Sequence, residues 1–443
     1  MNARELAYRI LYDVVVKKAY INISFAKHLR NDEVKEVDAA FVKELVYGVI
    51  ERKYTLDFIL SFFIKKSADT KALLLLEMGL YQLLYMDKVP DYAAINETVE
   101  IAKKFLGKKG ASFLNAVLRS YLREKEKVKF PDKQNFPYYL KVTYSYPDWI
   151  IERFLKNFDA DKVEKLLASL NEKPEISYRV NTLKISAEEL QEKLKREDIS
   201  YKKGYYLEEA LYIDLKNPES HPIYKDGLIH PQDEASMLVS RILSPQKGER
   251  ILDVCAAPGG KTTHISQIME NTGEVVAFDL HPHRLKLIEE NCRRLGVTNV
   301  KTEVFDATFV NESYLEKADR VLADVPCTGI GIIRKKPDIK LKSYDKEELR
   351  GLIERQYRIL KSSSLYVKKG GVLVYSTCTI GREENQEVIE RFLKEHKNFE
   401  PADISEDLPL NLKVKTSDLG YIQTTPLEHK IDGFFIAKLK RIY

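Results

Sequence analysis

The chain has 443 residues, which is long enough for two or three domains that each bury a core. Hydrophobic residues make up 44% and charged residues 31%, the composition of an ordinary globular protein. The formal charge of +5, from 72 basic and 67 acidic residues, is compatible with nucleic acid binding but too small to argue for it alone.

Cysteine usage and apolar runs exclude several classes of protein. The four cysteines have no paired spacing, which argues against a metal site of the zinc type and against a disulfide framework. The richest apolar run, at residues 72–81, falls short of the ~20 residues that a membrane span needs, and the N-terminus lacks a signal pattern. We therefore expect a cytoplasmic protein with no membrane association.

Residues 1–130 are predicted to form an all-α bundle. Apolar residues recur there at helical spacing, for example at Ala7, Ile10, Leu11 and Val14. Four lysines flank a predicted helix-to-helix turn, namely Lys103, Lys104, Lys108 and Lys109. A cluster of this kind is by itself more typical of a solvated helix face.

Residues 131–245 are predicted to form a small α+β subdomain. A charged, proline-marked linker precedes it, at residues 123–137. Its clearest strand is the run Ser177–Thr182, which contains Arg179.

Residues 246–443 alternate regularly between strands and helices, which predicts a doubly wound α/β sheet. The expected strands lie at residues 251–255, 274–278, 300–304, 320–323 and 371–376. Helices are expected at residues 346–367 and 383–395. The final run, 433–439, follows a turn-like segment and predicts an antiparallel last strand.

The first strand of this sheet leads into a turn of small residues and then a helix. The sequence Ile251–His264 reads ILDVCAAPGGKTTH, which is the first crossover of a nucleotide-binding sheet. The dinucleotide fingerprint G-x-G-x-x-G is absent, and the sequence argues against a P-loop because its opening glycine would fall at Cys255. Asp279 ends the next strand about 20 residues downstream, the offset of a carboxylate that binds a ribose.

Four further motifs accompany the turn. They are HPQDEAS at 230–236, DVPCTG at 324–329, STCT at 376–379 and DGFFIA at 432–437. With CAAPGGKT, this set resembles the S-adenosylmethionine-dependent RNA cytosine-C5 methyltransferases from about residue 144 onward. The N-terminal pattern resembles the NusB-like domain that the RsmB/Sun branch of this family carries.

The resemblance implies S-adenosyl-L-methionine as cofactor, with S-adenosylhomocysteine as product, in a Rossmann-like domain. Backbone atoms of the turn would hold its methionine part, Asp279 its ribose and Asp306 its adenine, while Asp324 stands where methyl group and base meet. The expected cofactor-binding residues are Cys255, Ala256, Ala257, Pro258, Gly259, Gly260, Lys261, Asp279, Asp306 and Asp324.

Methylation of cytosine at C5 requires a thiol nucleophile, an acid and a base. Cys378, Cys327 and Asp324 are all predicted at carboxyl ends of strands, where open α/β sheets bind ligands. The family's Thr-Cys motif implies Cys378 as nucleophile, and Cys327 then assists product release. DNA cytosine methyltransferases instead place the nucleophile in a Pro-Cys motif, so the sequence alone leaves both assignments open.

As partner the resemblance implies 16S ribosomal RNA, or the small-subunit particle, and we expect a monomer. Lys103, Lys104, Lys108, Lys109 and Arg179 are then candidate RNA-binding residues. Two alternatives are a transfer RNA methyltransferase and a non-catalytic RNA-binding or antitermination module. The second would have been favoured by the loss of Cys378, Asp324 or the glycine turn.

Overall fold

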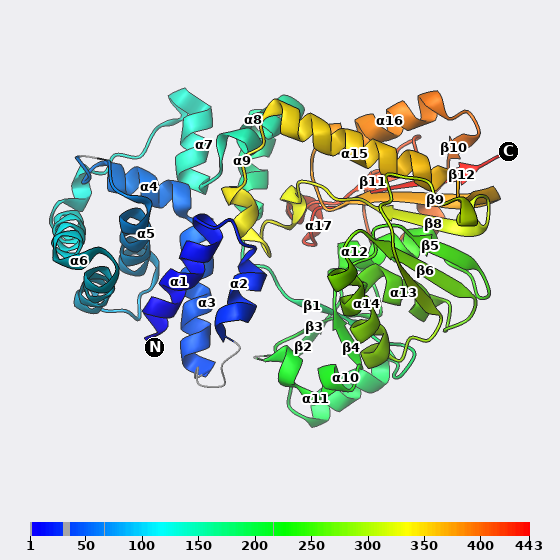
Figure 1. The fold of residues 1–443 in the computed structure, drawn as a ribbon, viewed down its shortest axis with the longest axis horizontal. Helices are drawn as coiled ribbons and strands as arrows, with labels where there is room; N and C mark the ends of the chain where they lie inside the picture. Colours follow the sequence, from blue (N-terminus) through cyan, green and yellow to red (C-terminus); the bar gives the residue numbers. More distant parts are fainter. Residues whose placement is uncertain (1, 30–35, 66, 216) are drawn as a thin grey trace. The chain divides into compact units, whose positions relative to one another are not determined.

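The computed structural model describes residues 2–29, 36–65, 67–215 and 217–443, which form two compact units (Figure 1). Unit 1 comprises Met1–Glu172 together with Ile333–Tyr344, and unit 2 comprises Lys173–Ile332 and Asp345–Tyr443. The chain therefore passes between the units three times. The domain boundaries expected at 130/131 and 245/246 stay predictions.

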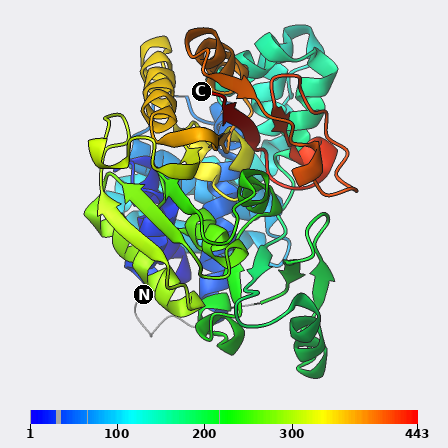
Figure 2. The same ribbon diagram turned by 90° about the vertical axis from the view of Figure 1, so that its right-hand side faces the viewer.

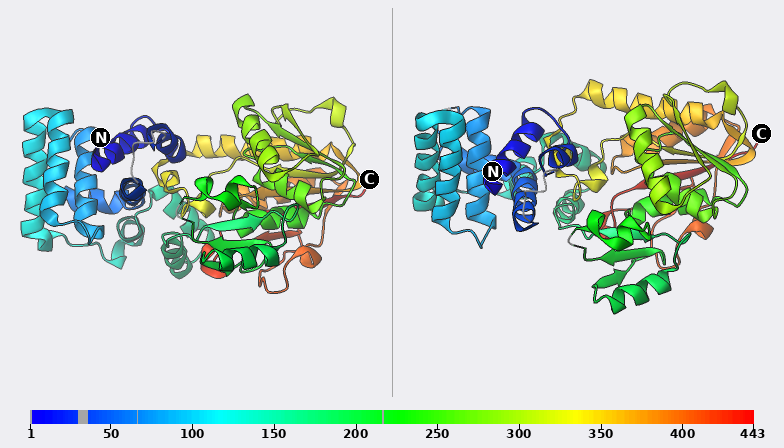
Figure 3. Two further views of the ribbon diagram at one scale, coloured as in Figure 1. Left: turned by 90° about the horizontal axis from the view of Figure 1, so that it is seen from below. Right: turned by 60° about the horizontal axis from the view of Figure 1, so that its bottom comes forward.

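Unit 1 is helical, as the apolar spacing predicted. Its α-helices are α1 (Ala3–Val15), α2 (Ile21–Leu29), α3 (Glu36–Glu51), α4 (Lys53–Ser61), α5 (Thr70–Tyr85), α6 (Asp91–Glu124), α7 (Phe136–Tyr144), α8 (Asp148–Asn157) and α9 (Ala160–Ser169). Helices α5 and α6 lie side by side (Figure 3). Among the helices that the structure describes, none has the length and apolar character that crossing a bilayer requires.

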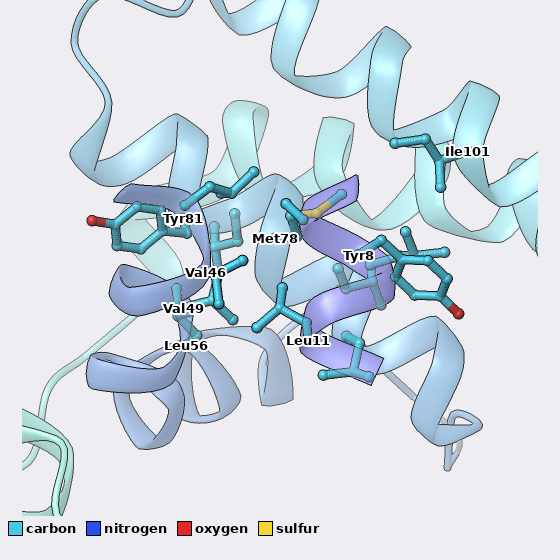
Figure 4. Close-up of a cluster of buried hydrophobic side chains, with 14 of the residues drawn as sticks. Tyr8, Leu11, Val46, Val49, Leu56, Met78, Tyr81 and Ile101 are labelled. Atoms are coloured by element: carbon cyan, nitrogen blue, oxygen red, sulfur yellow. The ribbon is translucent and has the colours of Figure 1, made fainter. Parts of the chain in front are cut away.

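The core of unit 1 lies between α1, α3, α4, α5 and α6. Side chains such as Leu11 of α1, Val46 of α3 and Met78 of α5 meet there and are fully or almost fully buried (Figure 4). Helix α6 is interrupted at Gly107, whose φ of 70° is left-handed. This break is the turn that the sequence predicted beside the lysine cluster.

The short segment Ile333–Tyr344, called the strap here, packs within unit 1 although it follows a strand of unit 2 in sequence. Its Lys340 is buried, and the Nζ atom donates to Asn171 Oδ1 at 2.7 Å and to the Glu51 carbonyl at 3.2 Å. The same ammonium lies 3.8 Å from the ring centre of Tyr146. Trp149 Nε1 donates to the Lys342 carbonyl at 2.7 Å.

Unit 2 begins with a small antiparallel sheet in the order β2-β3-β1-β4. Its elements are β1 (Ser177–Val180), α10 (Ala187–Arg196), β2 (Tyr201–Lys203), β3 (Ala210–Ile213), α11 (Pro222–Lys225) and β4 (Ile229–Pro231). The predicted strand with Arg179 is β1. Ser186 and Glu189 form a reciprocal capping box at the start of α10.

The rest of unit 2 is one large sheet in the order β10-β12-β9-β8-β5-β6-β7, with β11 paired to β12. Its strands are β5 (Arg250–Asp253), β6 (Glu274–Asp279), β7 (Val300–Val304), β8 (Ala318–Asp324), β9 (Val367–Thr377), β10 (Phe399–Pro401), β11 (Tyr421–Gln423) and β12 (Phe435–Arg441). Strands β5 to β9 pair in parallel, and β12 is antiparallel to β9. This confirms the doubly wound sheet and the antiparallel last strand.

Helices cover both faces of this sheet. They are α12 (Glu234–Leu243), α13 (Gly260–Ile268), α14 (Pro282–Leu295), α15 (Lys346–Ser364), α16 (Gln386–Glu395) and the short α17 (Pro426–His429). Helices α12 and α13 lie on one face and α15 and α16 on the other (Figures 1 and 2). Alternate strand residues face opposite ways: Ile251 belongs to a buried cluster with side chains of α12 and α13, whereas Leu252 belongs to one with side chains of α15 and α16. Burial on both faces explains why these strands are continuous apolar runs.

Candidate active site

The turn after β5 is held by the backbone of the neighbouring strands. The Val254 amide donates to the Leu322 carbonyl of β8 at 3.0 Å, and the Ala256 amide donates to the Phe278 carbonyl of β6 at 2.8 Å. Two side chains of α14 donate to turn carbonyls, Arg284 to Ala257 at 2.9 Å and Asn291 to Pro258 at 3.0 Å. The hydrogen bonds from α14 therefore fix the carbonyl groups of Ala257 and Pro258 in position.

Gly259 makes the turn sterically feasible. Its φ is +97°, a conformation that L side chains rarely adopt, and a Cβ there would lie 3.2 Å from the Ile288 Cα. The next residue, Gly260, begins α13, so the amide end of that helix faces the carboxyl edge of the sheet.

Asp253 lies at the end of β5, directly before the turn, and is buried. Its Oδ2 accepts from Thr262 Oγ1 at 2.7 Å, while its buried Oδ1 has no hydrogen-bond partner in the described part of the chain. Burial, with a further contribution from the Asp324 charge, raises the pKa of Asp253 to about 7.

Asp279 and Asp306 follow the next two strands, as predicted from the sequence. Asp279 Oδ1 accepts from the His281 amide at 3.0 Å, and Oδ2 lies 3.2 Å from Arg284 Nη1. Asp306 Oδ1 accepts from the amide and hydroxyl of Thr308 at 2.9 and 2.7 Å. Although partial burial raises the pKa of Asp306, these hydrogen bonds lower it below its usual value.

Asp324, at the end of β8, is held from two sides. Lys261 Nζ donates to Asp324 Oδ2 at 2.7 Å, and Ser376 Oγ of β9 donates to Oδ1 at 2.7 Å. Although burial lowers the pKa of Lys261, its ion pair with Asp324 raises that pKa above the usual value. Lys261 also lies 5.1 Å from the ring centre of Phe434.

The two motif cysteines meet at the same edge. Strands β8 and β9 are parallel neighbours with Asp324 opposite Ser376, and beyond them the sulfurs of Cys327 and Cys378 lie 3.4 Å apart. Both cysteines are partly exposed. The hydrogen bond with Cys378, then burial and the charges of Glu384 and Asp324, raise the pKa of Cys327 well above its usual value.

The other two cysteines are not part of this pair. Burial, followed by the charge of Asp253, raises the pKa of Cys255 well above the usual value of a thiol. Cys292 is buried on α14, and burial raises its pKa to about 11. Both therefore remain protonated at neutral pH.

The candidate RNA-binding residues differ in their surroundings. Lys103, Lys104, Lys108 and Lys109 are exposed on α6, on either side of Gly107; Lys103 pairs with Glu100 and Lys104 with Glu5. Arg179, in contrast, is 1% exposed, and its guanidinium bonds to Gln232, Gln267, Thr263 and the Gly260 carbonyl. This guanidinium supports the first turn of α13 from the interior, so the structure offers it no surface for a phosphate.

Several residues of the site were not singled out from the sequence. Ser376, Thr328, Gln356 and Glu384 form hydrogen bonds around Asp324 and the cysteine loops. Arg382, four residues after Cys378 in sequence, forms ion pairs with the exposed carboxylates Glu387 and Glu390. Residues so far apart in sequence carry no shared local pattern.

A parallel sheet extended by an antiparallel strand beside β9, with a glycine turn after β5 and carboxylates at successive strand ends, defines a Rossmann-like methyltransferase domain. Comparisons with known proteins agree. Residues 240–440 match the model described as 16S rRNA methyltransferase RsmB/F, residues 1–123 match the NusB family, and residues 146–218 match the RsmF/B-like ferredoxin-like domain.

Relatives of full length are also found. The chain is 38% identical to the probable ribosomal RNA small subunit methyltransferase B of Bacillus subtilis, over 99% of each chain. It is 32% identical to the ribosomal RNA small subunit methyltransferase B of Shewanella oneidensis, again over 99% of each. The chain therefore belongs to the RsmB/F family of methyltransferases.

Two solved structures are similar to the whole chain or to part of it. The crystal structure of PH0851 superposes with a TM-score of 0.82 at 27% identity and covers 99% of both chains. The structure of NSun6 from Pyrococcus horikoshii with SFG gives a TM-score of 0.59 at 26% identity, over 66% of this chain and 97% of the other.

Proposed function

We propose that this protein transfers a methyl group from S-adenosylmethionine to C5 of a cytosine in small-subunit ribosomal RNA, through a covalent adduct between a cysteine and C6. The observation that carries the proposal is the pair of partly exposed sulfurs 3.4 Å apart at the carboxyl edge of the sheet, next to Asp324. Family membership and the names of the full-length relatives support the RNA substrate.

The residues around the glycine turn fit the cofactor that the family implies. Among the described residues, the buried Oδ1 of Asp253 has no hydrogen-bond partner. Together with the turn at the left-handed Gly259 and the carboxylate of Asp279, it offers polar groups where a nucleoside with an amino acid end would lie. Backbone atoms of 255–261 would hold the methionine part, Asp279 the ribose and Asp306 the adenine. When bound there, the cofactor supplies an electrophilic methyl group, and a relative was solved with the S-adenosylmethionine analogue SFG.

We assign Cys378 as nucleophile. Its thiolate adds to C6 of the cytosine, which makes C5 an enamine carbon able to accept a methyl group. A base then removes the C5 proton, and the electrons of that C–H bond form the C5=C6 double bond and expel the Cys378 sulfur as a thiolate, which releases the methylated base. Cys327, the neighbouring sulfur, assists this release.

Asp324 is assigned to the polar edge of the cytosine. Lys261 and Ser376 fix both of its carboxylate oxygens, so the side chain is oriented before the base arrives. A group held in this way needs little reorganisation during the reaction, which is how preorganised polar groups contribute to catalysis.

We further propose that the exposed lysines 103, 104, 108 and 109 contact RNA phosphates. A transfer RNA substrate remains the main alternative, and bisulfite sequencing of total RNA from a deletion strain decides between the two. Loss of one methylated cytosine from 16S RNA is expected; loss from a transfer RNA alone would replace the proposed substrate.

The cysteine assignment is tested with two variants incubated with substrate RNA and cofactor. Cys378→Ser should abolish both methylation and any covalent complex, because serine forms no alkoxide at neutral pH. Cys327→Ala should still attack and methylate but then stall with RNA attached, visible as a slow band on a denaturing gel. Cys292→Ser, a buried thiol away from the pair, is the control and should behave as the native chain.

A covalent band from Cys378→Ser together with none from Cys327→Ala would reverse the assignment. If neither the native chain nor either variant methylates RNA, the protein acts as a binding module instead.

A further inference from the structure

Glu384 is a buried carboxylate next to the two catalytic loops. It is the last residue of a short 3-10 helix, Arg382–Glu384, and is 0% exposed. Oε2 accepts from the Thr328 amide and from Gln356 Nε2, both at 2.9 Å, and Oε1 accepts from Thr328 Oγ1 at 2.5 Å. Three hydrogen-bond donors from Thr328 and Gln356 therefore converge on this one carboxylate.

These hydrogen bonds hold the chain on both sides of Cys327. Thr328 directly follows this cysteine, and Gln356 Nε2 also donates to the carbonyl of Pro326, which directly precedes it, at 2.9 Å. The hydroxyl of Thr328 lies 2.8 Å from that of Thr379, the residue after Cys378. Glu384 therefore fixes the Cys327 loop and, through one hydroxyl pair, its position against the Cys378 loop.

The charges around the two sulfurs are unequal. Besides the Cys378 sulfur, the groups that face Cys327 are the carboxylates of Glu384 and Asp324 and the phenol of Tyr375. Near Cys378 lies a cation, the Lys261 ammonium, which is bound to Asp324 and interacts with charge on the Cys378 sulfur. A cation beside a thiol favours the thiolate, and anions beside it disfavour the thiolate.

We infer that Glu384 is a positioning residue that keeps the proton on Cys327, so that Cys378 is the sulfur that becomes the thiolate nucleophile. On this inference the Cys327 thiol is the donor in the 3.4 Å contact between the two sulfurs. This inference rests on the proposed function, and it adds a reason why one of two adjacent, partly exposed thiols attacks.

The test measures the reactivity of each thiol in the full-length protein, without RNA or cofactor. The native chain is treated with iodoacetamide at a series of pH values, and peptide mass spectrometry gives the alkylation rate of each cysteine. The half-maximal rate is expected at lower pH for Cys378 than for Cys327. The reverse order would overturn the inference without any variant.

The second arm uses Glu384→Gln, which keeps the shape of the side chain but removes its charge. The buried Oε1 of Gln356 has no hydrogen-bond partner in the part of the chain that the structure describes, so the cluster has an acceptor for the new amide. The alkylation midpoint of Cys327 is expected to fall by about one pH unit. Glu390→Gln, which removes an exposed carboxylate on α16, is the control and should leave both midpoints unchanged.

A Cys327 midpoint that stays in place in folded Glu384→Gln would show that the residue only supports the loop. Should this variant not fold, the order of the two midpoints in the native chain still decides. Alkylation of the cysteines needs no methyl transfer. The alkylation experiment can therefore refute this inference while the protein still methylates RNA, and failure to methylate RNA leaves the alkylation result unaffected.

Discussion

The buried ammonium of Lys340 allows a quantitative prediction about the stability of unit 1. Burial lowers the pKa of Lys340 to about 7; the charge of Glu51 acts against this shift and that of Arg52 adds to it. An unfolded lysine has its usual pKa of about 10.4. Between these two values the unfolded chain binds more protons than the folded chain, so stability rises with pH.

The size of the effect follows from the two pKa values. From pH 7 to pH 9 this one group should increase the free energy of unfolding by about 2 kcal/mol. The contribution of Lys340 to the free energy of unfolding levels off as the pH approaches the pKa of the unfolded lysine. Well below pH 7 the contribution is constant and destabilises the folded chain most. Lys340→Met removes the titration and should therefore show a smaller rise over the same interval.

Urea unfolding at pH 7, 8 and 9 measures this difference. The only tryptophan of the chain, Trp149, donates to the Lys342 carbonyl and packs against Tyr344, so its fluorescence reports on the strap. Other groups that titrate here, including Asp253, are present in both proteins and cancel in the comparison. Parallel pH dependences of the native chain and Lys340→Met would refute the reasoning.

Two further predictions concern ligands. Asp279→Ala should weaken S-adenosylmethionine binding by about 1–3 kcal/mol, the range for a lost hydrogen bond to a charged group, and calorimetry that finds unchanged affinity would remove Asp279 from the site. Reversal of two exposed charges, in Lys108→Glu with Lys109→Glu, should lower RNA affinity and flatten its salt dependence by about one unit of log–log slope or more. Filter binding at several salt concentrations, with Lys202→Glu in unit 2 as control, measures this change; an unaltered slope would place the lysines outside the RNA interface.

Central strands such as β5 and β6 could be predicted because they are mostly apolar and buried on both faces. Strands β5, β6 and β7 lie within one or two residues of the expected ranges. The expectations for β8 and β9 were too short, at 320–323 and 371–376 against Ala318–Asp324 and Val367–Thr377. Near their first residues both strands carry charged side chains, such as Asp319 and Lys368, which pair with each other at 2.8 Å. These charges interrupt the apolar pattern, so the pattern did not indicate the first residues of the strands.

The site was predictable where motifs sit at strand ends, and not where partners are distant in sequence. Cys327 and Cys378 were expected at the carboxyl ends of strands; they follow the parallel neighbours β8 and β9, and their sulfurs lie 3.4 Å apart. The bond from Lys261 to Asp324 joins residues 63 positions apart, and no local pattern signals it. Arg179 was a candidate RNA-binding residue; its buried acceptors come from α13 and from Gln232, far along the chain, and no local pattern indicates them.

The strap has a consequence for how this protein can be divided. The backbone leaves unit 2 six residues after Cys327, runs through unit 1 as Ile333–Tyr344, and returns at Asp345 to begin the segment with α15. Within unit 1 it is held by the buried Lys340 and by Tyr54, whose hydroxyl donates to the Lys340 carbonyl at 3.0 Å. A single cut near residue 172 would thus leave the strap on the C-terminal piece, stripped of its apolar and polar partners. If the catalytic half is expressed alone, a redesigned connection should replace the strap. If the two halves keep the native strap and are co-expressed, we expect them to reassociate through the strap.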